Sequence, residues 1–171
     1  MCYKRNGNYR KFYLGCMNLY PSLQDRLNNQ HQAIKEIIAD ISNERIHEEL
    51  INGKWSIHDN IAHLARFQPI FIERIETIIL NDEPSFESYT AELDEEFEVW
   101  RNKPTIELLE QLYKDRKLLF RLLSLMPGEK LLRAGIHKKY GRLNMLQWTE
   151  FFLLHEAHHI LTIFKLANGI V

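Results

Sequence analysis

The sequence comprises 171 residues, 45% of them hydrophobic, and its 22 lysines and arginines nearly balance 23 aspartates and glutamates, for a formal net charge of −1. A chain of this size can bury one substantial core as a single domain, while the balanced charge lacks the basic excess that would hold nucleic acid or an anionic membrane. Because no apolar run approaches the roughly eighteen residues of a membrane span, and the N-terminus lacks the apolar core of a signal peptide, we expect a cytoplasmic protein that contacts neither nucleic acid nor membrane.

Residues 1–17 are predicted to be a loosely ordered basic leader that precedes the folded domain. The segment carries four basic residues and no acidic one, and it shows little helical periodicity. It could instead act as a basic interaction arm, and Met17 could be the natural start of the chain. Both cysteines, Cys2 and Cys16, lie in this segment, so the domain offers no thiolate ligand, disulfide or cysteine nucleophile.

The domain, residues 18–171, is predicted to begin with a helix over residues 22–41. Leucine and isoleucine side chains recur along it at spacings of three and four, the pattern of a helix with one buried face. His31 lies close to this apolar stripe, so it is a candidate fourth group near a metal, although we favour an ordinary histidine at the boundary of the core. The polar residues 42–54 then form a connection.

A capping box marks the start of the second predicted helix, residues 57–79. The Ser56 side chain can accept a hydrogen bond from the first amides, and Asp59 lies three residues later in the reciprocal position. His63 flanks the apolar stripe of this helix. Pro69 lies inside the pattern and is expected to kink the helix beyond His63, unless neighbouring groups satisfy the carbonyl that it leaves free.

Helical periodicity is lost over residues 81–103, which contain eight acidic residues. A solvated crossover with a short helix through residues 93–100 explains this composition better than a cation site. A third helix is predicted over residues 105–125, and the Pro127-Gly128 pair stops it.

The last apolar stretch, residues 143–167, is predicted to form the fourth helix, with a capping box made by Asn144 and Gln147. His155 and His159 lie on its apolar stripe, and residues four apart on a helix have Cβ atoms about 5–6 Å apart. Two imidazoles at that spacing can share one metal ion, whereas unbound they would leave donors and acceptors to be satisfied away from water. We therefore favour a metal site over two hydrogen-bonded core histidines.

Four long helices without a convincing strand predict an all-α four-helix bundle. The long crossover can span the bundle and return the third helix parallel to the second, which gives an up-down-down-up arrangement. In that topology His63 lies about 9 Å and His159 about 12 Å from the same end of the bundle. The three histidines, His63, His155 and His159, therefore lie at a similar height in the bundle. The predicted topology and the predicted metal site thus support each other.

The segment from His155 to His159 also reads H-E-x-x-H, the pattern of a zinc metalloprotease. Such enzymes usually take their third ligand downstream of the motif helix, but residues 160–171 contain no histidine, aspartate or glutamate. We therefore give the protease hypothesis little weight. Glu156 and His158 could assist proton transfer, yet Glu156 points about 100° away from His155 and can equally be solvated, and His158 is expected to be half-exposed. We assign no catalytic residue beyond the ligands.

The sequence contains four short motifs in a characteristic order, namely Trp55-Ser56-Ile57, Ala62-His63-Leu64, Gly141 and His155-Glu156-Ala157-His158-His159. Over roughly residues 19–167 their order and spacing resemble the DinB-like (DinB/YfiT) superfamily of bacterial four-helix-bundle proteins. In that family a histidine of the second helix and an H-x-x-x-H pair of the fourth bind a divalent metal, so the resemblance implies His63, His155 and His159 as its ligands. Some members are metal-dependent transferases or isomerases that use thiols such as bacillithiol or mycothiol.

These features predict a metal-dependent enzyme, of the thiol S-transferase or hydrolase type, that acts on a small molecule. Three neutral histidines leave an open position on zinc or nickel, where water or a thiol loses its proton near neutral pH. The expected partners are a small-molecule substrate and a low-molecular-weight thiol. A homodimer is an alternative to a monomer. The alternative is a non-catalytic metal-binding bundle that serves a stress response or an interaction, which a fourth protein ligand such as His31 would favour.

Overall fold

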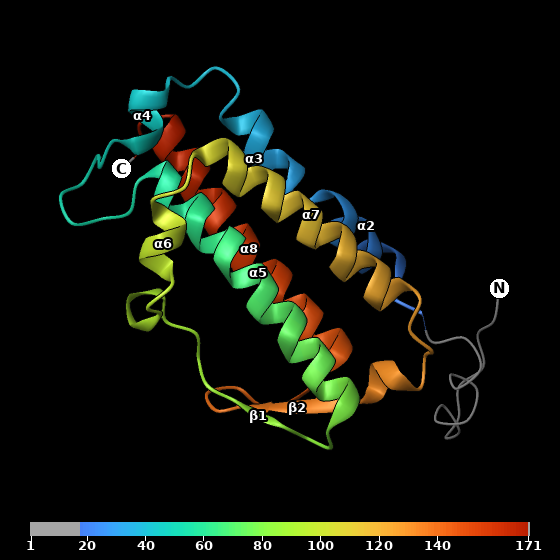
Figure 1. The fold of residues 1–171 in the computed structure, drawn as a ribbon. Helices are drawn as coiled ribbons and strands as arrows, with labels where there is room; N and C mark the ends of the chain where they lie inside the picture. The colour runs from blue at the N-terminus through green and yellow to red at the C-terminus, as the bar shows by residue number, and fades with distance from the viewer. Residues whose placement is uncertain (1–17, 171) are drawn as a thin grey trace.

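The computed structural model describes residues 18–170, so the predicted basic leader, residues 1–17, lies outside the described residues. The architecture is mostly helical, and the helical segments α2–α3, α5, α7 and α8 lie side by side with short strands at one end (Figure 1). In chain order the elements are α2 (Pro21–Asn29), α3 (Gln32–Ile37), α4 (Asn43–His47), α5 (Ile57–Leu80), β1 (Ser85–Phe86), η2 (Ala91–Leu93), α6 (Phe97–Arg101), α7 (Thr105–Ser124), η3 (Lys130–Leu132), β2 (Ala134–His137), β3 (Gly141–Asn144) and α8 (Met145–Ala167). None of the helices within residues 18–170 combines the length and the apolar character needed to cross a membrane.

The predicted single helix over residues 22–41 is wrong, because the chain forms two shorter helices, α2 and α3, separated at Gln30 and His31. The carbonyl of Leu27, which would accept from the His31 amide in an unbroken helix, instead accepts a hydrogen bond from Nη1 of Arg116 at 3.3 Å. A side chain from a distant helix thus replaces the local bond at the break.

Both predicted capping boxes are present. The amide of Asp59 donates to Oγ of Ser56 at 3.1 Å, and the amide of Ser56 donates to Oδ2 of Asp59 at 2.9 Å. At the start of α8 the reciprocal bonds between Asn144 and Gln147 are both 2.9 Å. These bonds satisfy amides that a helix leaves unpaired at its N-terminus, and α5 then continues through Pro69.

The expectation of a fold without strands is wrong. Strands β2 and β3 form an antiparallel hairpin, and β1, from the crossover, pairs with β2 in parallel (Figure 1). Each strand has four residues or fewer, which is too short for alternating hydrophobicity to predict. Residues 143 and 144 therefore belong to β3, and the last helix begins at Met145.

Gly135 occupies a position in β2 where the main chain passes close to two apolar side chains. A Cβ atom at this position would lie 2.7 Å from Cε2 of Phe86 and 3.0 Å from Cγ1 of Ile78. We predict that Gly135→Ala lowers the free energy of unfolding by about 1–3 kcal/mol, because the added methyl group must displace packed side chains. Urea denaturation of the variant and the wild type measures this difference, and coincident curves would contradict it.

The long helices enclose two apolar clusters, one toward the strands and one toward the opposite end of the bundle. Contacts between helices define which ends meet. His58, near the start of α5, lies 2.8 Å from Oγ1 of Thr105 at the start of α7, whereas Asn60 lies 2.8 Å from His159, in the second half of α8. On α8, His155 and His159 fall between the residues of the two clusters. On α5, His63 lies among residues of the second cluster, about one turn before Phe67 of the first.

Candidate metal centre

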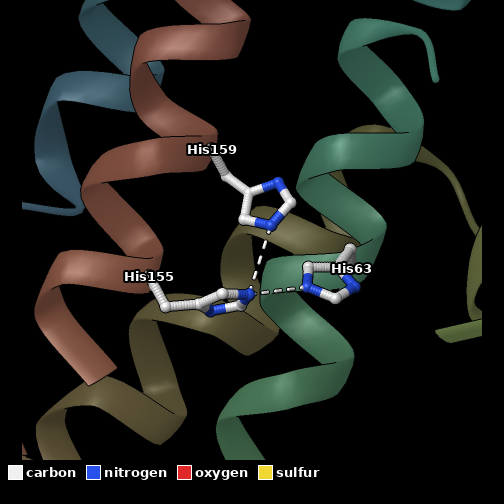
Figure 2. Close-up of side chains that lie close together, drawn as sticks. All are labelled: His63, His155 and His159. Atoms are coloured by element: carbon white, nitrogen blue, oxygen red, sulfur yellow. Dashed lines mark hydrogen bonds between the residues drawn. The ribbon is translucent and has the colours of Figure 1, made fainter. Parts of the chain in front are cut away.

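The three histidines predicted as ligands lie together in the interior of the bundle. Helix α5 contributes His63, and α8 contributes His155 and His159, with the three rings turned toward one another (Figure 2). Nε2 of His155 lies 3.1 Å from Nε2 of His63 and 3.2 Å from Nε2 of His159. All three ligand atoms lie within 4.8 Å of one another, and no other histidine, cysteine, aspartate or glutamate of residues 18–170 joins the group.

This spacing fits a divalent ion. Nitrogens that lie 2.0–2.1 Å from one zinc ion at tetrahedral angles are about 3.3–3.4 Å apart. The two Nε2 distances around His155 are close to that value, and all three ligand atoms lie within 4.8 Å of one another, so the three side chains can share one ion. Imidazole nitrogens suit zinc and nickel, among other transition metals.

The environment keeps all three imidazoles uncharged at neutral pH. Burial, reinforced by the other histidines, lowers the pKa of His63 to about 3 and that of His159 to about 2. Burial and the nearby His158 lower the pKa of His155 to about 4. Because only a neutral imidazole has a lone pair to offer a metal, the three rings are in the form that binds.

Asn60 fixes the tautomer of one ring. Nδ1 of His159 donates to Oδ1 of Asn60 at 2.8 Å, while the amide group of Asn60 donates to the carbonyl of Ser56, also at 2.8 Å. A proton on Nδ1 leaves Nε2 with the lone pair that faces the centre. In contrast, Nδ1 of His63 and Nδ1 of His155 are buried without a partner among residues 18–170.

We predict that Asn60→Ala weakens metal binding about 10- to 100-fold, because His159 loses the acceptor that orients it. Asn60→Asp keeps an acceptor at this position and is expected to retain most of the affinity. Competition with a chromogenic chelator measures both constants. Equal loss in the two variants would show that Asn60 acts through packing alone.

Two other histidines of interest lie outside the centre. His158 is exposed, although its ring centroid is 5.3 Å from that of His159. His58 is buried, with Nδ1 2.8 Å from Oγ1 of Thr105 and Nε2 2.7 Å from the carbonyl oxygen of Arg101. His58 therefore joins the start of α5 to the end of α6 and the start of α7.

His31 and Glu156 belong to a separate buried network. Nδ1 of His31 lies 3.3 Å from Nη1 of Arg116, and the Glu156 carboxylate forms an ion pair with the same guanidinium. Arg116 and Glu156 are each only 1% exposed, and Gln68 accepts from Arg116 at 2.9 Å. The alternative of a solvated Glu156 is therefore wrong, and His31 is a core residue away from the three-histidine group.

Two cavities border the centre. The larger, of about 510 Å³, reaches His159 and is lined partly by Trp55, Lys54 and Lys165. The smaller, of about 200 Å³, reaches His155 from the side of the strands. Small-molecule sites in proteins are concavities of this kind beside a few polar groups.

Sequence reasoning missed two residues near the centre, Asn60 and Arg74. Asn60 lies one turn before His63 on α5, and Arg74 lies about three turns after it, which places both on nearly the same face of the helix. A polar residue on the face that carries a candidate ligand is the signal that could have identified them.

The helical bundle and its three converging histidines place this protein in the class of candidate metalloproteins. Sequence comparison then assigns the chain to a family. A model of the DinB superfamily matches residues 26–163. The chain therefore belongs to the DinB superfamily, and the matched range includes all three histidines.

A solved structure has the same fold. YfiT from Bacillus subtilis, described as a probable metal-dependent hydrolase with an unusual four-helix bundle topology, is 15% identical to this chain. The two superimpose with a TM-score of 0.74 over 87% of this chain and 86% of YfiT. The fold is thus that of the YfiT four-helix bundle, and in this chain a three-stranded sheet lies at one end of the bundle (Figure 1). No curated protein sequence matches the chain.

Proposed function

We propose that this protein is a metal-dependent enzyme that binds zinc or nickel through His63, His155 and His159 and acts on a small molecule, as a hydrolase or a thiol S-transferase. One observation carries the proposal: three neutral Nε2 atoms converge, and no fourth protein ligand from residues 18–170 completes the group. Structural zinc sites usually have four protein ligands, whereas catalytic sites have three and an open position. The missing fourth ligand favours an enzyme over a non-catalytic binding bundle.

A divalent ion bound by three neutral imidazoles lowers the pKa of a water or thiol beside it and so supplies a nucleophile near neutral pH. The protein's own contribution is to hold and orient the ligands and to limit the access of water. Asn60 orients His159, and aromatic rings cover the site, with centroids 5.0 Å from His63 for Trp55 and 4.7 Å from His155 for Phe67.

We further propose that residues 18–171 form one domain and that its bundle has an up-down-down-up arrangement, with residues 81–103 crossing from the second helix to the third. The contacts between helix ends support this, since the start of α5 meets the start of α7 and the second half of α8. The description of YfiT as a bundle of unusual topology agrees with it.

The proposed activity can be measured with two reactions run side by side. We expect the metal-loaded protein to hydrolyse an activated ester, or to transfer bacillithiol or glutathione to chlorodinitrobenzene, and to lose the activity when the metal is removed or in His155→Ala. The rate should rise with pH through the ionisation of the bound water or thiol, because the deprotonated form is the nucleophile. His158→Ala, which alters an exposed neighbour outside the three-histidine group, should retain the metal.

The two reactions also distinguish the two types of enzyme. A rate that needs added thiol identifies a transferase, and a rate that does not need it identifies a hydrolase. Equal rates for metal-loaded and metal-stripped protein in both reactions would contradict the proposal.

A further inference from the structure

The cavity beside His155 contains charged groups that the three-histidine centre does not use. The residues that line it come from α5, the crossover after β1, the end of β2 and the turn after it, and α8. Its lining includes Phe67, Arg74, His137, Lys139, Tyr140 and Phe151, together with His155 itself. No carboxylate side chain is among the residues that line it.

Arg74 is buried without an anionic partner. Its side chain is 9% exposed, and Nη2 donates to the carbonyl oxygen of Glu87 at 2.8 Å. No carboxylate of residues 18–170 forms an ion pair with it. The other deeply buried arginine, Arg116, is paired with Glu156. Burying an unpaired charge costs free energy. An anion from outside the protein that bound the Arg74 guanidinium would offset this cost.

Aromatic contacts do not replace that anion. The guanidinium carbon of Arg74 lies 5.8 Å from the ring centroid of Phe67, 5.7 Å from that of Phe86 and 5.9 Å from that of Trp148. These distances are near the outer limit of about 6 Å for a cation–π interaction. The rings hold the guanidinium in place, and neither Nε nor Nη1 of Arg74 is among the buried atoms of residues 18–170 that lack a partner, so these N–H groups are open to the cavity.

Two more donors face the same cavity. His137 is 3% exposed, and its Nδ1 accepts a hydrogen bond from the amide of Lys139 at 3.1 Å. The proton of the neutral ring is therefore on Nε2, which makes that atom a donor. The ammonium group of Lys139 is on an exposed side chain at the edge of the cavity. A guanidinium, an imidazole N–H and an ammonium around one cavity recognise an oxyanion.

The cavity also has apolar walls and leads to the candidate metal centre. The ring of Phe67 lies between the two regions, with its centroid 4.7 Å from the His155 ring and 5.8 Å from the guanidinium carbon of Arg74. Tyr140 and Phe151, which also line the cavity, form an aromatic pair with centroids 5.0 Å apart. This combination suits an anion that carries a small apolar body.

We propose that this cavity binds the carboxylate of a small substrate through Arg74, His137 and Lys139, and so places the rest of the molecule against the three histidines. The inference rests on the proposed function for its catalytic purpose, but anion binding itself needs no metal. Failure of metal binding would therefore leave the carboxylate site testable, and failure of carboxylate binding would leave the metal centre intact.

The test is isothermal titration of the metal-free full-length protein with benzoate, with benzamide as the neutral ligand of the same shape and inorganic phosphate as the other oxyanion. We expect benzoate to bind with a dissociation constant of about 1 mM or lower and benzamide to bind at least tenfold more weakly. Arg74→Met is expected to weaken benzoate binding at least tenfold, with Arg74→Lys in between. Circular dichroism and metal content establish that each variant is folded.

A second pair of variants decides the outcome if Arg74→Met does not fold. Lys139→Met and Lys138→Met remove the same charge from neighbouring exposed positions, but only Lys139 lines the cavity. We expect Lys139→Met alone to weaken benzoate binding, by about threefold or more. Equal benzoate and benzamide affinities, an unchanged affinity in folded Arg74→Met, or equal effects of the two lysine variants would each overturn the proposal. Tighter binding of phosphate than of benzoate would overturn its assignment to a carboxylate.

Discussion

Replacing any one of His63, His155 and His159 with alanine is expected to abolish stoichiometric binding of a divalent metal. Two imidazoles cannot retain an ion as three do, and each ring supplies one of three Nε2 atoms that lie within 4.8 Å of one another. The loss of any one ring should therefore reduce metal content from about one equivalent to nearly none. Elemental analysis by mass spectrometry of each purified, dialysed variant measures this.

His158→Ala is the matched control for these variants. It removes an imidazole adjacent to His159 in sequence, but from an exposed side chain that is not part of the group. Its metal content should equal that of the wild type. Full occupancy in His63→Ala would disprove the three-histidine assignment, because it would show that α8 binds the ion without α5.

Arg116→Met is expected to cause the largest loss of stability, about 3–5 kcal/mol, because it leaves the Glu156 carboxylate buried without its cation. Arg116 and Glu156 are each 1% exposed. The guanidinium also donates to the side chain of Gln68 and to the carbonyl of Leu27, so the substitution also leaves these acceptors unpaired. Urea denaturation monitored by circular dichroism gives the difference in free energy of unfolding.

Arg26→Met provides the comparison, since Arg26 also pairs with a glutamate of α8, Glu150, but in a pair whose side chains are 35% and 27% exposed. A pair so accessible to water is expected to contribute at most about 1 kcal/mol. The double variant Arg116→Met with Glu156→Leu should recover much of the stability, because neither charge remains buried. Similar decreases in the free energy of unfolding for Arg116→Met and Arg26→Met would show that the buried pair contributes no more to stability than the exposed pair.

The long helices and the His155–His159 pair could be predicted because their signals are local. A helix can be recognised from apolar side chains at spacings of three and four and from a capping box such as that of Ser56 and Asp59. Both signals lie within a few neighbouring residues. The pair His155 and His159 shares one helical face for the same reason. The placement of His63 depended on the predicted arrangement of the second and fourth helices. In the structure its Nε2 atom lies beside that of His155, at the same height in the bundle.

The features that escaped prediction depend on partners far away in sequence. The break between α2 and α3 follows from Arg116, which takes the Leu27 carbonyl. The strands are short and pair across long separations, so their sequence alone carries little signal. The burial of Glu156 depends on the same Arg116, and the unpaired charge of Arg74 is visible only once the surrounding residues are in place.

Anomalous diffraction from crystals of the purified protein, collected at the zinc and nickel absorption edges, tests the metal centre most directly. We predict one strong peak between α5 and α8, about 2.0–2.1 Å from the Nε2 atoms of His63, His155 and His159. The absence of a peak from metal-loaded crystals, or a peak held by other side chains, would contradict it.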